Sequence, residues 1–256
     1  MKTGVLVHGC NLNIENWRHV AWGDPPHRMG RIPQGILIAS QFDAQVVVFG
    51  TGASSKPFRL GGGPAAAKPL LEAEYSLEYL RQYFDSLQSF EPIREHFAAD
   101  GDQQWPDFRA RMLAKIQLDT ECQNTIEEIQ AAAKVFLQHD VQRIILVSSP
   151  SHVVRCLRDA TALFAEHPDY RRWSHQILAC PSNTCYEGTT PGDVVVVEPP
   201  HRPDRHVVPT HRRIQRMLAL QKLEHDDLVQ LIEQFDDLLQ RFEHRCFIDS
   251  HINGKS

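Results

Sequence analysis

Short apolar runs alternate along the chain with longer stretches in which apolar residues recur every three or four positions. The first pattern predicts β-strands, and the second predicts helices with one buried face. Strands are expected at Gly4–His8, Ala44–Phe49, Ile116–Leu118, Ile144–Val147, Gln176–Ala179 and Asp193–Val197. Helices are expected at Arg31–Phe42, Leu70–Leu87, Asn124–Gln138 and Pro150–Glu166. This alternation predicts an α/β fold, a three-layer sandwich with a mostly parallel sheet between two layers of helices.

Three other stretches complete the expected organisation. Lys56–Pro69 is rich in glycine and proline and is expected to be a loop. Phe90–Arg111 is expected to be an irregular insertion with a short helix. Apolar positions within residues 209–256 predict helices that pack on the domain or, in a homodimer, on a second copy of the chain. We therefore expect one domain over residues 1–208, with a C-terminal helical extension over residues 209–256.

Composition narrows the class of protein. At 256 residues, with 42% hydrophobic and 23% charged residues, the chain suits a globular α/β protein with a sizeable core. A net charge of −5 argues against general nucleic-acid binding, which needs a basic surface. No apolar run reaches about 18 residues and no signal-peptide pattern is present, so we expect a cytoplasmic protein without membrane contact. The six scattered cysteines are expected to be free thiols, and their spacing contains no metal motif.

Polar or glycine-rich residues follow three of the expected strands. Their sequences are His8-Gly9-Cys10-Asn11, Gly50-Thr51-Gly52 and Ser148-Ser149-Pro150. In open α/β sheets, ligands bind beyond the carboxyl ends of the strands, where glycines allow close approach and hydroxyls form hydrogen bonds. Neither the dinucleotide-binding glycine fingerprint nor the phosphate-binding loop motif occurs in the sequence. The three strand ends therefore predict a ligand pocket without specifying its ligand.

The strand end at Ser148 is the most informative of the three. Ser149 is a good helix N-cap and Pro150 suits the first helical position, so the start of a helix is expected to face the pocket. His152 and Arg155 are three residues apart and share one face of that helix. The helix dipole beside a histidine and an arginine predicts a site for an anion. The alternative is that Ser149 only caps the helix and that His152 lies on the surface.

These blocks resemble the YdcF/SanA-like proteins, a widespread bacterial family with a Rossmann-like α/β fold. The resemblance extends from about Gly4 to Val197 and is most specific in Val147-Ser-Ser149-Pro150-Ser-His152-Val-Val-Arg155. It also includes the first two strand ends, Glu74, and the block Cys122-Gln-Asn124-Thr125-Ile-Glu127-Glu128. The resemblance implies that the polar blocks converge at one pocket. The residues that it places there are Asn11, Gly50, Gly52, Glu74, Asn124, Thr125, Glu127, Ser149, His152 and Arg155.

The chain departs from the family pattern at several positions. His8 and Cys10 stand where the first loop of the family carries consecutive glycines. Cys122–Thr125 replaces a Ser-Thr-Asn-Thr sequence, and Glu128 replaces a second asparagine. Many SanA-like members are anchored in a membrane and linked to the cell envelope. This sequence has no such anchor, so we do not expect it to share that role.

Two residues are candidates for catalysis. His152 can act as a general acid or base because an imidazole titrates near neutrality, or it can donate a hydrogen bond to a phosphate held by Arg155. Glu127 is the second candidate. Asn124 and Glu127 also have the spacing of a helix-capping box, which explains both residues equally well. Metal ligation by His8, His152 and a carboxylate has no supporting spacing in the sequence.

We therefore expect the pocket to bind a nucleotide-like, adenosyl-bearing or phosphorylated small molecule, such as S-adenosylmethionine. The chain is expected to be an enzyme that transfers or hydrolyses a group of this ligand. The alternatives are a non-catalytic ligand sensor or interaction protein that uses the same pocket, and a metal-dependent hydrolase. The expected ligand-binding residues are His8, Gly9, Asn11, Gly50, Thr51, Gly52, Glu74, Asn124, Thr125, Ser148, Ser149 and Arg155.

Overall fold

The structure is a computed structural model that describes residues 1–58, 68–97, 105–186, 189, 229–230 and 233–234. The chain divides into two compact units, Met1–Pro209 and Thr210–Ser256. The four described residues of the second unit are helical. The strand expected at Asp193–Val197, and the C-terminal helices expected over 209–256 apart from those four residues, lie outside the described residues.

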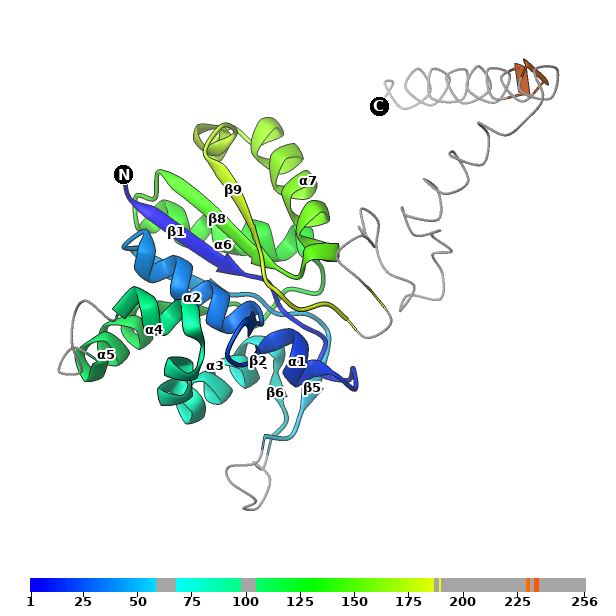
Figure 1. Ribbon diagram of the computed structural model, residues 1–256. Coiled ribbons are helices and arrows are strands. Elements are labelled where there is room, and N and C mark those ends of the chain that lie inside the picture. Colours follow the sequence, from blue (N-terminus) through cyan, green and yellow to red (C-terminus); the bar gives the residue numbers. More distant parts are fainter. Residues whose placement is uncertain (59–67, 98–104, 187–188, 190–228, 231–232, 235–256) are drawn as a thin grey trace. The chain divides into compact units, whose positions relative to one another are not determined.

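Five parallel strands form the central sheet of the first unit (Figure 1). The strands are β1 (Thr3–Val7), β4 (Val46–Phe49), β7 (Ile116–Leu118), β8 (Arg143–Ser148) and β9 (Ile177–Pro181). Their order across the sheet is β7-β4-β1-β8-β9, and every neighbouring pair is parallel. The expected strands that fall within the described residues are all present, and the predicted α/β class is confirmed.

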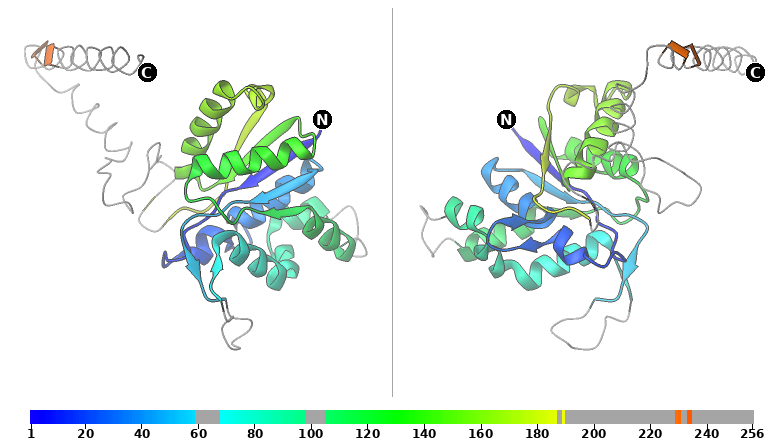
Figure 2. Two further views of the ribbon diagram at one scale, coloured as in Figure 1. Left: turned by 180° about the vertical axis from the view of Figure 1, so that it is seen from behind. Right: turned by 45° about the vertical axis from the view of Figure 1, so that its right-hand side comes forward.

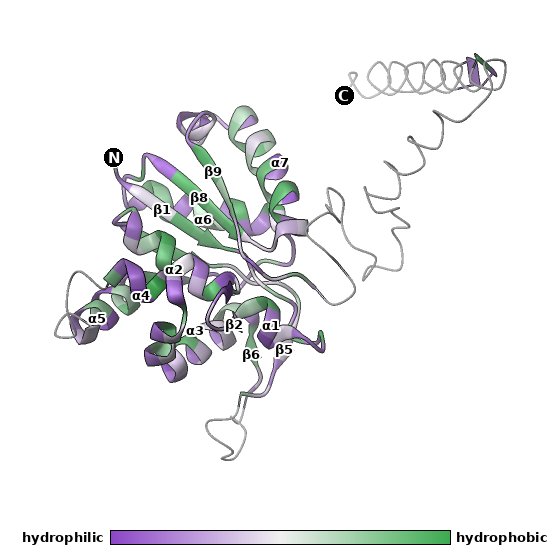
Figure 3. Cartoon of the chain, viewed as in Figure 1, coloured by the Kyte–Doolittle hydropathy of each residue, from purple (hydrophilic) through white to green (hydrophobic). Residues whose placement is uncertain are grey.

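Helices cover both faces of this sheet (Figures 1 and 2). They are α1 (Trp17–Ala21), α2 (Arg31–Gln41), α3 (Glu72–Tyr83), α4 (Glu91–Phe97), α5 (Trp105–Lys115), α6 (Thr125–Gln138) and α7 (Pro150–Glu166). Successive strand residues point to opposite faces, so the core forms two clusters. One packs Val5 and Val47 against α2 to α5, and the other packs Leu6 and Leu146 against α6 and α7. The strands are correspondingly among the most apolar parts of the chain (Figure 3).

The direction of winding reverses between β1 and β8. From β1 the chain proceeds through β4 to β7, and β8 and β9 then add to the other side of β1. Val7 pairs with both Phe49 and Val147, so the three strands end at one level. The N–H of His8 donates to Val147 O at 3.0 Å, and the N–H of Gly50 donates to Val7 O at 2.9 Å. Ligands of open α/β sheets bind at such a switch point, and here it gathers the three polar strand ends.

Two stretches differ from the sequence predictions. The described part of Phe90–Arg111 contains α4 and the beginning of α5, where one short helix was expected, and these helices bury Ile93 and Phe108 in the core. The residues before α3 form a short strand, β6 (Leu70–Leu71), instead of the first turn of a helix. It pairs antiparallel with β5 (Ser55–Lys56), so the ends of the expected loop are tied together. Residues 59–67 of that loop lie outside the described residues.

Several short elements have no counterpart among those expected. They are α1, the antiparallel pair β2 (Gly23–Asp24) and β3 (Arg28–Met29), and the 3₁₀ turn Arg171–Trp173. The last turn of the helix expected at Leu70–Leu87 is a 3₁₀ turn, Phe84–Ser89. No helix within the described residues has the length and apolar content needed to cross a membrane.

Candidate functional site

A cavity of about 630 Å³ lies at the carboxyl ends of the strands. Its wall consists of the loops after β1 and β4, the first turns of α6 and α7, and the segment after β9. This volume is typical of sites that bind small molecules. Eight of the residues expected at the ligand site line the cavity, namely Gly9, Asn11, Thr51, Gly52, Asn124, Thr125, His152 and Arg155.

The start of α6 is held by a reciprocal set of hydrogen bonds. Asn124 is the N-cap, and its Oδ1 accepts from the N–H of Glu127 at 3.1 Å. The Glu127 carboxylate accepts from the N–H of Gln123 at 2.7 Å and from Asn124 Nδ2 at 2.6 Å. Glu127, the second catalytic candidate, therefore stabilises the helix start and does not line the cavity. Asn124 and Thr125 do line it.

The start of α7 combines an expected and an unexpected feature. Pro150 occupies the first helical position after Ser149, as the sequence predicts. The Ser149 hydroxyl does not cap the helix, because it accepts from Nε and Nη2 of Arg31 at 3.1 and 2.6 Å. A helix that begins at Pro150 leaves the N–H of Ser151 without an intrahelical acceptor, and Ser151 lines the cavity. The positive end of the helix dipole therefore lies at the cavity wall.

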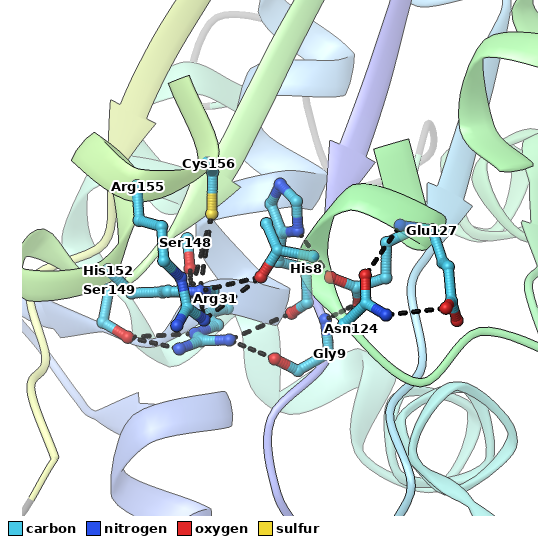
Figure 4. Close-up of polar contacts among 12 residues, drawn as sticks. His8, Gly9, Arg31, Asn124, Glu127, Ser148, Ser149, His152, Arg155 and Cys156 are labelled. Atoms are coloured by element: carbon cyan, nitrogen blue, oxygen red, sulfur yellow. Dashed lines mark hydrogen bonds and ion pairs between the residues drawn. The ribbon is translucent and has the colours of Figure 1, made fainter. Parts of the chain in front are cut away.

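His152 and Arg155 are in direct contact on this first turn (Figure 4). Nδ1 of His152 lies 2.7 Å from Ser148 Oγ, and its Nε2 faces Nη2 of Arg155. Nη2 also donates to Thr125 Oγ1 at 3.1 Å. A guanidinium can only donate, so Nε2 of His152 is the acceptor and Nδ1 carries the proton. His152 can therefore take a proton from a ligand only after Arg155 has moved away from Nε2.

His8 is buried behind the cavity and does not line it. Its Nδ1 lies 2.8 Å from Glu128 Oε2, and Glu128 Oε1 accepts from the N–H of Gly9 at 2.8 Å. Burial acts to lower the pKa of His8, but the neighbouring Cys156 and Glu128 raise it to about 10. His8 is 2% exposed and Glu128 is 4% exposed. At neutral pH the two residues therefore form a buried ion pair.

Arg31 on α2 joins three of the loops that follow strands. Its guanidinium donates to the carbonyls of His8 and Gly9, to Ser149 Oγ, and to the hydroxyl of Tyr186 at 2.8 Å. The side chain is 1% exposed. Tyr186 comes from the segment after β9 and lines the cavity. One buried cation thus holds the ends of β1, β8 and β9 in a fixed arrangement.

Glu72 is the first residue of α3 and lines the cavity. Its Oε1 accepts from the hydroxyl of Ser54 at 2.6 Å and from the N–H of Ser54 at 3.3 Å. Burial raises the pKa of Glu72, the hydrogen bonds from Ser54 oppose this rise, and the charge of Glu128 adds to it. Glu72 therefore binds a proton more readily than an ordinary glutamate.

Glycines at two strand ends leave room for the carboxylates of Glu72 and Glu128. A Cβ atom at Gly9 would lie 2.6 Å from Glu72 Oε2 and 3.1 Å from Glu128 Oε1. A Cβ atom at Gly50 would overlap Glu128 Oε1. Gly50 itself does not line the cavity. The close approach that these glycines permit is therefore an approach of protein side chains.

Other expected residues also have structural partners. Glu74 accepts from the N–H of Leu71 at 2.8 Å, so it caps α3 and does not reach the cavity. Ser148 and Ser149 support His152 and Arg31 from outside the cavity lining. Within the described residues, no three histidine, cysteine, aspartate or glutamate side chains are arranged to hold a metal ion.

Sequence reasoning missed several residues of the cavity lining, among them Glu72, Glu128 and Tyr186, and it also missed Arg31 beside the cavity. Glu72 had a usable signal, because it lies in the first turn of the helix expected at Leu70–Leu87 and two residues before Glu74. Glu128 stood out only as a departure from the family pattern. Arg31 and Tyr186 have no local signal, since 155 positions separate them in the sequence.

Glu72→Gln is expected to stabilise the protein at pH 8 and to have little effect at pH 4. A carboxyl group whose pKa is raised by folding contributes stability below its unfolded pKa, and this stability is lost as the pH rises through the folded value. Glutamine still accepts from Ser54 but cannot ionise. Thermal melts at pH 8 measure the effect, and we expect the Tm of the variant to lie above that of wild type. Each kcal/mol gained in the free energy of unfolding raises the Tm by about 2–4 °C. Glu74→Gln is the control, and a lower Tm for Glu72→Gln at pH 8 contradicts the prediction.

Comparison of the chain with protein-family models, with curated proteins and with solved structures finds no match in any of the three.

Proposed function

We propose that the cavity binds a nucleotide-like, adenosyl-bearing or otherwise phosphorylated small molecule, and that the chain is a YdcF/SanA-like protein. The observation that most strongly supports this ligand class is that Arg155, Thr125 and the start of α7 face the same cavity of about 630 Å³. A guanidinium beside a helix N-terminus provides the charge and the hydrogen-bond donors that phosphate oxygens need. We also propose that the protein is cytoplasmic, as the sequence predicts.

The contact between His152 and Arg155 suggests how binding leads to chemistry. An anion that draws the guanidinium toward itself frees Nε2 of His152, which can then accept a proton from the ligand or from water. This sequence of events suits an enzyme that transfers or hydrolyses a group of the ligand. In the alternative function, a ligand sensor, the same shift of Arg155 occurs without turnover.

The ligand class can be tested by thermal stability. Inorganic phosphate, AMP, ribose 5-phosphate and S-adenosylmethionine are added separately to the full chain. A ligand present at about 100 times its Kd stabilises the folded state by about 2.7 kcal/mol, which raises the Tm by about 5–10 °C for a domain of this size. We expect at least one phosphate-bearing probe to produce such a shift.

Matched variants place the site. Arg155→Met should abolish the shift, whereas Arg158→Met, on the same helix but outside the cavity lining, should retain it. A shift that survives in Arg155→Met places the anion elsewhere. With the bound probe, turnover that is lost in His152→Ala supports an enzyme, and binding without any turnover supports the sensor.

A further inference from the structure

Two buried carboxylates form a part of the cavity that the anion site does not use. Glu72 is 5% exposed and Glu128 is 4% exposed, and both line the cavity. They come from different helices, α3 and α6, and meet beside Gly9 at the end of β1. Oε2 of Glu72 and Oε1 of Glu128 both approach the point where a Cβ atom of Gly9 would lie. Their nearest oxygens therefore face each other across the strand end.

The hydrogen bonds of these two groups are unequal. Both oxygens of Glu128 are engaged, by His8 and by the N–H of Gly9. Oε1 of Glu72 accepts from Ser54, whose own hydroxyl accepts from the N–H of Leu12 at 2.8 Å. Oε2 of Glu72 forms no hydrogen bond with any described residue. Because Glu72 lines the cavity, this oxygen is available there to a hydrogen-bonding group of a ligand.

The charges favour a neutral partner. His8 balances Glu128, whereas Glu72 forms no ion pair with a described residue. Burial and the charge of Glu128 raise the pKa of Glu72, whereas the hydrogen bonds from Ser54 and the charge of Arg31 lower it, and the net shift is upward. Glu72 with a proton on Oε2 offers one donor, and Glu128 offers one carboxylate acceptor. Two neighbouring hydroxyl groups present the complementary acceptor and donor.

We propose that Glu72 and Glu128 form a subsite for the vicinal diol of a sugar whose phosphate lies at Arg155. This inference rests on the proposed function, since it assumes that the anion of the same ligand is bound beside Arg155 in the same cavity. It narrows the ligand class from any phosphorylated molecule to sugar phosphates and nucleotides. Both sources share the diol and the phosphate, and they differ in the base.

The test measures the binding of AMP, 2′,3′-dideoxy-AMP and ribose 5-phosphate by titration calorimetry. Loss of a hydrogen bond to a charged group weakens binding by roughly 10- to 100-fold. We therefore expect the dideoxy analogue to bind the wild-type protein about 10- to 100-fold more weakly than AMP. Equal affinity for AMP and ribose 5-phosphate identifies the sugar phosphate as the recognised unit, and a preference for AMP shows that the base contributes.

Three variants test whether Glu72 is responsible for the preference for AMP over its dideoxy analogue. Glu72→Met removes the donor and the acceptor at similar volume, so AMP and its dideoxy analogue should bind it equally. Glu72→Gln retains a donor and an acceptor, so the preference should persist. Glu74→Gln, outside the cavity lining, keeps an acceptor for the N–H of Leu71 and should behave as wild type. The Tm of each variant without ligand shows that it is folded.

The outcomes separate this inference from the function on which it rests. If AMP and the dideoxy analogue bind the wild-type protein equally and both are lost in Arg155→Met, the anion site stands and the diol subsite is wrong. If the preference persists in Glu72→Met, the diol is bound by other residues and the assignment is wrong. If no phosphate-bearing probe binds, the proposed function and the subsite both fall.

Discussion

Replacing Glu128 by methionine is expected to lower the free energy of unfolding by about 3–5 kcal/mol and the Tm by on the order of 10 °C. The reason is that the variant leaves the buried charge of His8 without its partner at 2.8 Å and the N–H of Gly9 without its acceptor. Burial of an unpaired charge is among the most destabilising changes that a single substitution can make. Urea denaturation at pH 6 measures the loss.

The control for this prediction is the neighbouring residue. Glu127→Met removes a helix cap from the same turn of α6 and should cost only about 1 kcal/mol. The double variant His8→Leu with Glu128→Met removes both charges, so it should be less destabilised than Glu128→Met alone. A loss in Glu128→Met no larger than that in Glu127→Met would show that the pair is not an ion pair in the folded protein.

The difference in the free energy of unfolding between wild type and Glu128→Met should depend on pH, because His8 titrates. Because its folded pKa is raised to about 10 from an ordinary 6.5, the stability that it contributes is fully present below pH 6.5 and is lost as the pH rises toward 10. The gap between wild type and Glu128→Met should therefore be largest at pH 6 and shrink by pH 9.

Replacing Arg31 by methionine is expected to lower the free energy of unfolding by about 3 kcal/mol. The change leaves the buried carbonyls of His8 and Gly9 and the hydroxyls of Ser149 and Tyr186 without their donor. Each buried acceptor that loses its donor costs about 1–3 kcal/mol, and rotation of the two hydroxyls recovers part of the loss. Equilibrium unfolding in urea measures the difference.

Two controls separate this network from general effects of losing an arginine. Arg28→Met changes an exposed arginine a short distance before α2 and should alter the free energy of unfolding by no more than about 0.5 kcal/mol. Tyr186→Phe removes one of the four acceptors and should cost at most about 1.5 kcal/mol. If Arg31→Met loses less than Tyr186→Phe, the guanidinium does not hold the three loops together.

His8 and Glu128 compensate each other at the end of β1, where their side chains are in direct contact. A histidine alone at this strand end would bury an uncompensated group, and a glutamate alone at position 128 would do the same. Each residue therefore makes the burial of the other possible.

Local patterns in the sequence determined the elements and the edge of the sheet at which the site lies. Apolar runs such as Ile144–Val147 form strands wherever they can be buried on both faces. Asn124 marks a helix start through the hydrogen bonds of its own turn, and Pro150 marks one through its fixed φ and missing N–H. Since the carboxyl ends of parallel strands meet at one edge, the polar residues after three strands were predictably close together.

Only the tertiary structure decided which side chains face the cavity. Neighbouring residues of a helix point about 100° apart, so the exact start of α3 sends Glu72 into the cavity and Glu74 to a cap, and the phase of α6 separates Glu128 from Glu127 in the same way. Arg31 joins loops from distant parts of the chain, and no local pattern reports such contacts. The sequence by itself therefore determined where a ligand site lies, while long-range packing decided which carboxylates and cations form it.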